Sequence, residues 1–98
     1  MSQLTELKSR IAATIAATDK ASGRDRRKAL ARIKWRMIAP RLGFWAGLTR
    51  DAEIVPVSSA AEAVVFDGRD NEDMKLRFYT QLTGIAWEVE LCGDGAAR

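Results

Sequence analysis

Two segments near the carboxyl end alternate apolar and polar residues, and this alternation constrains the fold most. In 74–80 and again in 85–91, every second residue is apolar or threonine. A period of two is typical of strands that bury one face. If the chain reverses at Leu82 and Thr83, or through a four-residue loop from Gln81 to Gly84, one register pairs apolar residues on one face and opposite charges on the other. The pairs are Phe78 with Trp87, Leu76 with Val89, Arg77 with Glu88, and Lys75 with Glu90. The sequence therefore predicts an antiparallel hairpin.

The amino-terminal segment 3–20 is predicted to form a helix. Its large apolar residues recur at spacings of three and four along one stripe: Leu4, Leu7, Ile11 and Ile15. Ser2 stands where an N-cap belongs, and the alanines of this segment have high helix propensity. We expect a helix that packs its stripe against the rest of the chain. An alternative is that the stripe forms a dimer seam.

A second amphipathic helix is predicted over 24–39, and Ser22 with Asp25 fits a capping-box start for it. Its apolar residues gather on one side: Leu30, Ile33, Met37 and Ile38. Lys28, Arg32 and Arg36, spaced four apart, run down the opposite side. Pro40 disfavours helix at the residue before it, so this helix should end at residue 39. The short loop between the two helices predicts an antiparallel helical hairpin.

The middle of the chain has weaker patterns. We interpret 40–50 as a glycine-punctuated aromatic connector loop. Residues 53–57 predict a short strand that Pro56 restricts to a sheet edge, because proline donates no ladder hydrogen bond. Residues 61–66 predict a further strand.

Helices that precede strands in this order predict an α+β fold, with an N-terminal antiparallel helical hairpin packed on a three- or four-stranded antiparallel β meander. A chain of 98 residues is one domain's worth. Residues 1–92 are therefore expected to form a single domain, and 93–98 a flexible tail.

The chain has no histidine and one cysteine, Cys92, so it lacks the commonest general base and the commonest zinc ligand. It has no nucleophile elbow, P-loop or dinucleotide-binding motif. The acidic stretch 67–73 does not follow EF-hand spacing, since Phe78 stands where the bidentate glutamate belongs. We therefore predict no enzymatic activity, no catalytic residues, no cofactor and no metal. Without a signal peptide or a membrane-length apolar run, we expect a cytoplasmic location and no membrane partner.

Charge is divided unevenly along the chain. Residues 1–50 hold twelve Lys and Arg against three acids, whereas 51–98 hold four against ten. A basic half favours an anionic partner. Arginines also crowd the start of the predicted helix 24–39, against the preference of the helix dipole, and binding would account for that cost. The candidate partner-binding residues are Arg24, Arg27, Lys28, Arg32, Arg36, Arg41 and Trp45.

The first hypothesis for the partner is nucleic acid, contacted at its phosphates with little sequence specificity, because no base-reading motif is present. An alternative is a small inhibitor or regulator that covers an acidic functional surface of a nucleic-acid-handling complex. Phage-type inhibitors such as anti-CRISPR proteins act in this way, although no motif assigns the chain to them. An exposed Trp45 beside Arg41 would then form a hot spot. A third hypothesis is a structural subunit that oligomerises through the first helix or the Pro56 edge.

Overall fold

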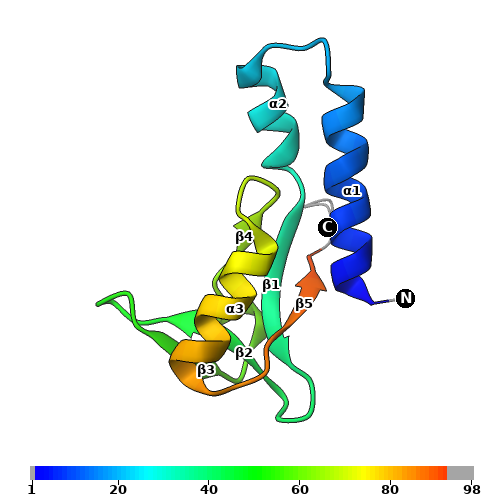
Figure 1. Ribbon diagram of the computed structural model, residues 1–98. Coiled ribbons are helices and arrows are strands. Elements are labelled where there is room, and N and C mark those ends of the chain that lie inside the picture. Colours follow the sequence, from blue (N-terminus) through cyan, green and yellow to red (C-terminus); the bar gives the residue numbers. More distant parts are fainter. Residues whose placement is uncertain (1, 93–98) are drawn as a thin grey trace.

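The fold is α+β, as predicted, in a computed structural model that describes residues 2–92 (Figure 1). The expected tail at 93–98 lies outside the described residues. The elements follow one another as α1 (Gln3–Ala17), α2 (Gly23–Leu30), β1 (Lys34–Ala39), β2 (Phe44–Leu48), β3 (Ile54–Val57), the 3-10 turn η1 (Ala60–Glu62), β4 (Phe66–Asp67), α3 (Glu72–Thr83) and β5 (Glu88–Leu91).

The sheet is antiparallel and is built around β1. Strands β1, β2 and β3 form a meander in the order β3-β2-β1. Trp35 of β1 pairs with both Phe66 of β4 and Leu91 of β5, so β4 and β5 lie on opposite edges of β1. Among the described strands, β3 pairs with β2 alone, and the prediction that Pro56 lies in an edge strand is confirmed.

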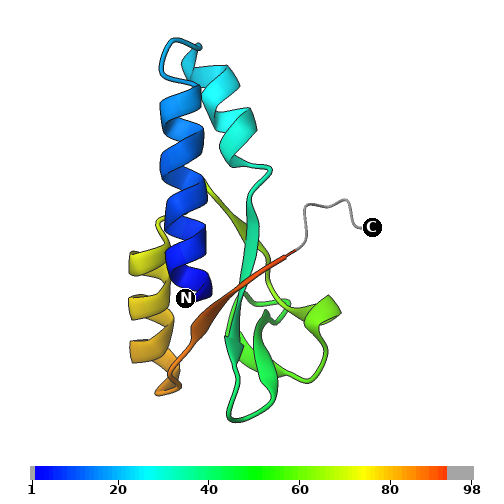
Figure 2. The same ribbon diagram turned by 90° about the vertical axis from the view of Figure 1, so that its right-hand side faces the viewer.

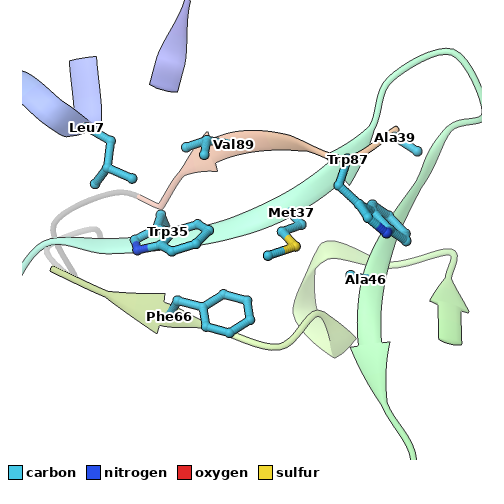
Figure 3. Packing of buried hydrophobic residues seen from close by; sticks show 8 residues of the cluster. All are labelled: Leu7, Trp35, Met37, Ala39, Ala46, Phe66, Trp87 and Val89. Atoms are coloured by element: carbon cyan, nitrogen blue, oxygen red, sulfur yellow. The ribbon is translucent and has the colours of Figure 1, made fainter. Parts of the chain in front are cut away.

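The core lies on the face of the sheet that α1 and α3 cover (Figure 2). Leu7, Trp35 and Met37 are fully buried there. Trp35 stacks on Phe66 with ring centroids 4.7 Å apart, and its indole N–H donates to the carbonyl oxygen of Asp67 at 2.9 Å. Figure 3 shows Trp35 beside Leu7 of α1 and Phe66 of β4. The central strand is therefore held to a helix and to a neighbouring strand by one side chain.

Both N-terminal helices begin at predicted caps. The hydroxyl oxygen of Ser2 accepts from the backbone N–H of Thr5, and that of Ser22 accepts from the N–H of Asp25. Helices α1 and α2 are in contact, which confirms the helical hairpin. Only the first part of the α1 stripe reaches the core, because Leu7 is fully buried whereas Ile15 is 44% exposed.

The predicted helix 24–39 is wrong beyond Leu30. After a turn at 31–32 the chain enters β1, whose residues are alternately buried and half-buried. The sequence permits this because Ile33, Trp35, Met37 and Ala39 are also every second residue. A strand at this place pairs on both edges and buries its large side chains, so tertiary packing outweighs local helix propensity.

The predicted hairpin between 74–80 and 85–91 is also wrong. Residues 72–83 form α3 instead, with the Asn71 side chain accepting from the backbone N–H of Met74 at 3.0 Å. At the other end Gly84 takes the left-handed conformation, with φ of +74°, that commonly ends helices. Of the predicted strand 85–91, residues 88–91 do form a strand, β5, but its partner is β1 and not the segment 74–80.

Two smaller predictions in the middle of the chain are also corrected. The segment 40–50 is not a loop throughout, because 44–48 form β2. The predicted strand 61–66 contains most of η1, and of its residues only Phe66 belongs to a strand of the sheet. The predicted strand 53–57 is confirmed as β3.

Candidate nucleic-acid interface

Helix α2 and the distal part of α1 project together from the sheet (Figures 1 and 2). We call residues 12–32 the helical arm. Helix α2 packs against α1, and its residues Ala29 and Leu30 are half-buried. Its remaining surface is open to solvent, so a large partner can approach the arm without meeting the sheet.

Arg26 is the arginine of α2 that points inward. Its Nη2 atom donates to the carbonyl oxygens of Thr18 and Asp19, at 3.1 and 3.4 Å. The carbonyls at a helix C-terminus lack intrahelical donors, and the helix dipole favours a cation there. Within the described residues the buried Nε atom of Arg26 has no hydrogen-bond partner. Arg26 therefore holds the turn of the arm together and is not available to a partner.

Four other cations, on α2 and the turn after it, point outward. They are exposed, and in the part of the chain that the structure describes none of them forms an ion pair: Arg24, Arg27, Lys28 and Arg32. Asp25 is the one acid between residues 20 and 41. These four side chains form a local concentration of positive charge that the fold itself does not neutralise.

A cleft of about 390 Å³ continues this surface toward α1. It is lined by Arg10, Thr14, Ala29, Arg32 and Ile33. The Nε atom of Arg10 donates to Glu6 at 3.1 Å, so this guanidinium is already partly engaged. The guanidinium of Arg32 and the hydroxyl group of Thr14, both from residues that line the cleft, are groups that can bind a phosphate oxygen.

Arg36 does not belong to this surface. It lies in β1, on the sheet face opposite the core, and its Nε donates to Oε1 of Glu90 at 2.6 Å. The indole N–H of Trp45 donates to the same oxygen at 2.8 Å. The predicted row of Lys28, Arg32 and Arg36 on one helix face is therefore wrong, because the three residues lie in a helix, a turn and a strand. The side chains of Arg36 and Trp45 both donate to the carboxylate of Glu90 within their own chain.

Removal of the acceptor that Arg36 and Trp45 share should lower the stability of the fold measurably. We expect Glu90→Ala to lower the free energy of unfolding by about 1–2 kcal/mol, because two half-buried donors lose their partner. Urea denaturation followed by circular dichroism measures this change. Glu88→Ala is the matched control, since Glu88 is exposed on the same strand and should cost less than about 0.5 kcal/mol. Equal stability of the two variants would contradict the network.

Arg41 is also apart from the arm. It lies in the turn between β1 and β2, at the end of the sheet away from α2 (Figure 1). There it lines a cleft of about 400 Å³ together with Leu42 and Glu88. Trp45 is half-buried and bonded to Glu90, so the predicted pair of an exposed Trp45 beside Arg41 is not formed. Of the candidate residues, the structure brings together only those of α2 and Arg32.

The acidic stretch 67–73 is organised by the protein's own cations. Asp67 accepts from the guanidinium of Arg69 at 2.7 and 3.0 Å, and these bonds hold the pKa of Asp67 below its usual value. In residues 2–92, no group of three or more His, Cys, Asp or Glu side chains is placed to hold a metal ion. No helix in that range is long and apolar enough to cross a membrane.

Comparisons with protein-family models, with curated proteins and with solved structures give no significant match. Inference about function therefore starts from the arm itself. Sequence reasoning found the cations of the arm through their local excess. It could not separate Arg36 from them, because the carboxylate that neutralises Arg36 lies 54 residues away along the chain.

Proposed function

We propose that this is a non-enzymatic, cytoplasmic protein that docks its helical arm on the phosphate backbone of nucleic acid with little sequence specificity. The observation that carries the proposal is a group of four exposed cations on α2 and the turn after it that form no ion pair within residues 2–92: Arg24, Arg27, Lys28 and Arg32. Unneutralised cations in such a group attract a polyanion and release its counterions on binding.

The spacing of these cations suits a phosphate backbone. Arg24 and Lys28 are one helical turn apart, about 6 Å along the axis. Phosphates follow one another at about 3.4 Å of axial rise along one strand, so neighbouring cations can reach different phosphates. Because α2 projects from the sheet, its exposed side can lie along a duplex without a clash.

Low sequence specificity follows from what the arm contains. Residues 12–32 include no aromatic side chain on which a base can stack. Trp35 and Trp87 are buried, and Trp45 is bonded to Glu90. Backbone contacts position a protein on nucleic acid but do not read sequence.

The proposal predicts a steep dependence of affinity on salt. Titration of a labelled DNA duplex by fluorescence anisotropy, from about 50 to 200 mM salt, should give a log–log slope of about −0.9 for each phosphate contacted. Four contacts correspond to a slope of about −3.6. The triple variant Arg27→Gln, Lys28→Gln, Arg32→Gln should reduce the magnitude of that slope by about three, because three phosphate contacts are lost.

A matched control removes the same charge elsewhere. Arg41→Gln, Arg50→Gln, Arg77→Gln alters three exposed arginines outside the arm and should leave the slope near the wild-type value. If both triple variants weaken binding equally, net charge and not the arm is responsible. If the unaltered protein binds neither DNA nor RNA at about 50 mM salt, the proposal is wrong, and an acidic protein surface becomes the better candidate partner.

A further inference from the structure

We propose that the outer face of α3 binds an amphipathic helix of a partner protein, one whose apolar ridge is bordered by acidic residues. This surface is distinct from the arm, and the inference does not depend on nucleic-acid binding. It rests on an exposed apolar stripe, on a cleft at one end of that stripe, and on the charges at its two sides.

The stripe consists of three large side chains spaced four residues apart. Met74 is 65% exposed, Phe78 57% and Leu82 60%. Residues at this spacing lie one above another on a helix. Figure 2 shows α3 at the margin of the molecule, with no other element on its outer side. The stripe is therefore continuous and open.

The opposite side of α3 already packs on the domain. Leu76 and Tyr79 are half-buried against the core. Helix α3 is thus apolar on two sides, and its own fold uses only one of them. A helix of a monomeric domain normally presents a polar outer face, and a contiguous apolar patch marks an interaction site. Removal of these three large side chains from water favours association, so the stripe can anchor a partner.

A cleft extends the stripe at its carboxyl end. Leu82 forms one wall of a cleft of about 540 Å³, and Ile54 and Pro56 of the edge strand β3 form the other. A large apolar side chain at the end of the partner's ridge can enter there. Such a pocket beside an exposed ridge is typical of grooves that receive a helix.

Positive charge borders the stripe on both sides. With 100° of rotation per residue, Lys75 and Arg77 flank the line of Met74, Phe78 and Leu82. Arg77 is exposed and forms no ion pair within the described residues. The ammonium group of Lys75 lies 5.7 Å from the centre of the Phe66 ring and makes no ion pair there either. Acidic residues beside the partner's ridge would complement both cations.

The acids of α3 do not cancel these cations. Glu72 and Asp73 at its start accept from the ammonium group of Lys8 in α1, at 3.0 and 2.6 Å. They are thus engaged with another helix, and hydrogen bonds to both raise the pKa of Lys8. The border along α3 is therefore positive, whereas Glu53 is an acid that lines the cleft at the carboxyl end of the stripe.

The same charges disfavour a second copy of this chain as the occupant. A two-fold antiparallel pairing of the stripe places Phe78 against its own counterpart at the axis and Met74 against Leu82. Arg77 is adjacent to Phe78, so the two copies of Arg77 come together near the axis. Like charges placed opposite each other oppose association. We therefore assign the face to a different, acidic partner.

The test uses two synthetic peptides of about 18 residues, long enough to form a helix in water. Both carry leucine at three positions spaced four apart, bordered by glutamate in one peptide and by lysine in the other. In fluorescence anisotropy titrations at about 50 mM salt, the glutamate peptide should bind about tenfold more tightly, since its acids can pair with Arg77 and Lys75 whereas lysines are repelled by them. Arg77→Glu should remove this preference, because the stripe is then bordered by an acid on one side and by Lys75 on the other.

Phe78→Ser should abolish binding of the glutamate peptide without unfolding the domain. Leu42→Ser is the matched control, because Leu42 is 60% exposed in the turn between β1 and β2, outside α3, and it should bind like the unaltered protein. The inference is overturned if neither peptide binds, if the two bind equally, or if Phe78→Ser still binds. Dimers in analytical ultracentrifugation that disappear on Phe78→Ser would also overturn it, in favour of a second copy.

Discussion

Replacement of Trp35 by alanine should lower the free energy of unfolding by about 4–5 kcal/mol. Truncation of a buried tryptophan costs about 3–5 kcal/mol, and the loss includes its stacking on Phe66. The carbonyl oxygen of Asp67 also loses its indole donor, which adds to the cost if no water replaces it. A domain of this size has roughly 5–15 kcal/mol of stability in total. Urea denaturation should therefore show a variant that is marginally folded.

Trp35→Phe separates the two contributions. It keeps an aromatic ring against Phe66 and removes the hydrogen bond, so we expect a loss of about 2 kcal/mol. Leu42→Ala, at an exposed turn, should change stability by less than about 0.5 kcal/mol. If Trp35→Ala lies within about 1 kcal/mol of the unaltered protein, the residue is not the centre of the core.

The second large effect is expected at Leu7, the buried residue of α1. Leu7→Ala should cost about 3 kcal/mol, because a fully enclosed side chain leaves a cavity between α1 and the sheet. The backbone N–H of Leu91 in β5 donates to the Gln3 side chain at 2.7 Å, so it reports the docking of α1. Its hydrogen exchange should accelerate together with the loss in stability.

Ile15→Ala is the control for Leu7→Ala. Ile15 lies on the same stripe of α1 but is 44% exposed, so its truncation should cost less than about 1 kcal/mol. Equal losses at the two positions would mean that the whole of α1 packs on the sheet. The arm would then not project freely, and the surface proposed for nucleic acid would be more restricted.

Local signals predicted the first helix, the start of the second and the edge position of β3. Ser2 and Ser22 accept from the backbone where their positions before an apolar or basic run indicated caps. The stripe of α1 was evident because Leu4, Leu7 and Ile11 fit one period only. Pro56 indicated an edge strand because it lacks a donor for a second partner. Each of these predictions depends on groups within a few residues of one another.

The errors come from segments that fit two periods. In 74–82 the apolar residues are at even positions, and even positions include both a strand face and the i, i+4 rows of a helix. The cap at Asn71 and the left-handed Gly84 favour the helix locally. The pattern in 33–39 also fits both a helix and a strand. There the chain forms a strand, because β1 pairs along both of its edges.

In the candidate site, too, local patterns predicted some features and only tertiary contacts decided others. The excess of cations in 24–32 is a property of composition, and the structure leaves four of them exposed. The assignment of Arg36 to that group failed because Glu90, which binds both Arg36 and Trp45, comes from the far end of the chain. The apolar stripe of α3 escaped notice for a related reason. As a strand, 74–80 would bury Phe78 inside, whereas the helix turns it outward.

The amino-acid sequence by itself determined the α+β class, the caps of the two N-terminal helices, the edge position of β3 and the concentration of basic residues on the arm. These depend on backbone chemistry and on short-range spacing. Only the tertiary structure decided which period the ambiguous segments adopt and which charges meet. Those outcomes depend on how much apolar surface each arrangement buries and on partners remote in sequence, and neither quantity is contained in a local pattern.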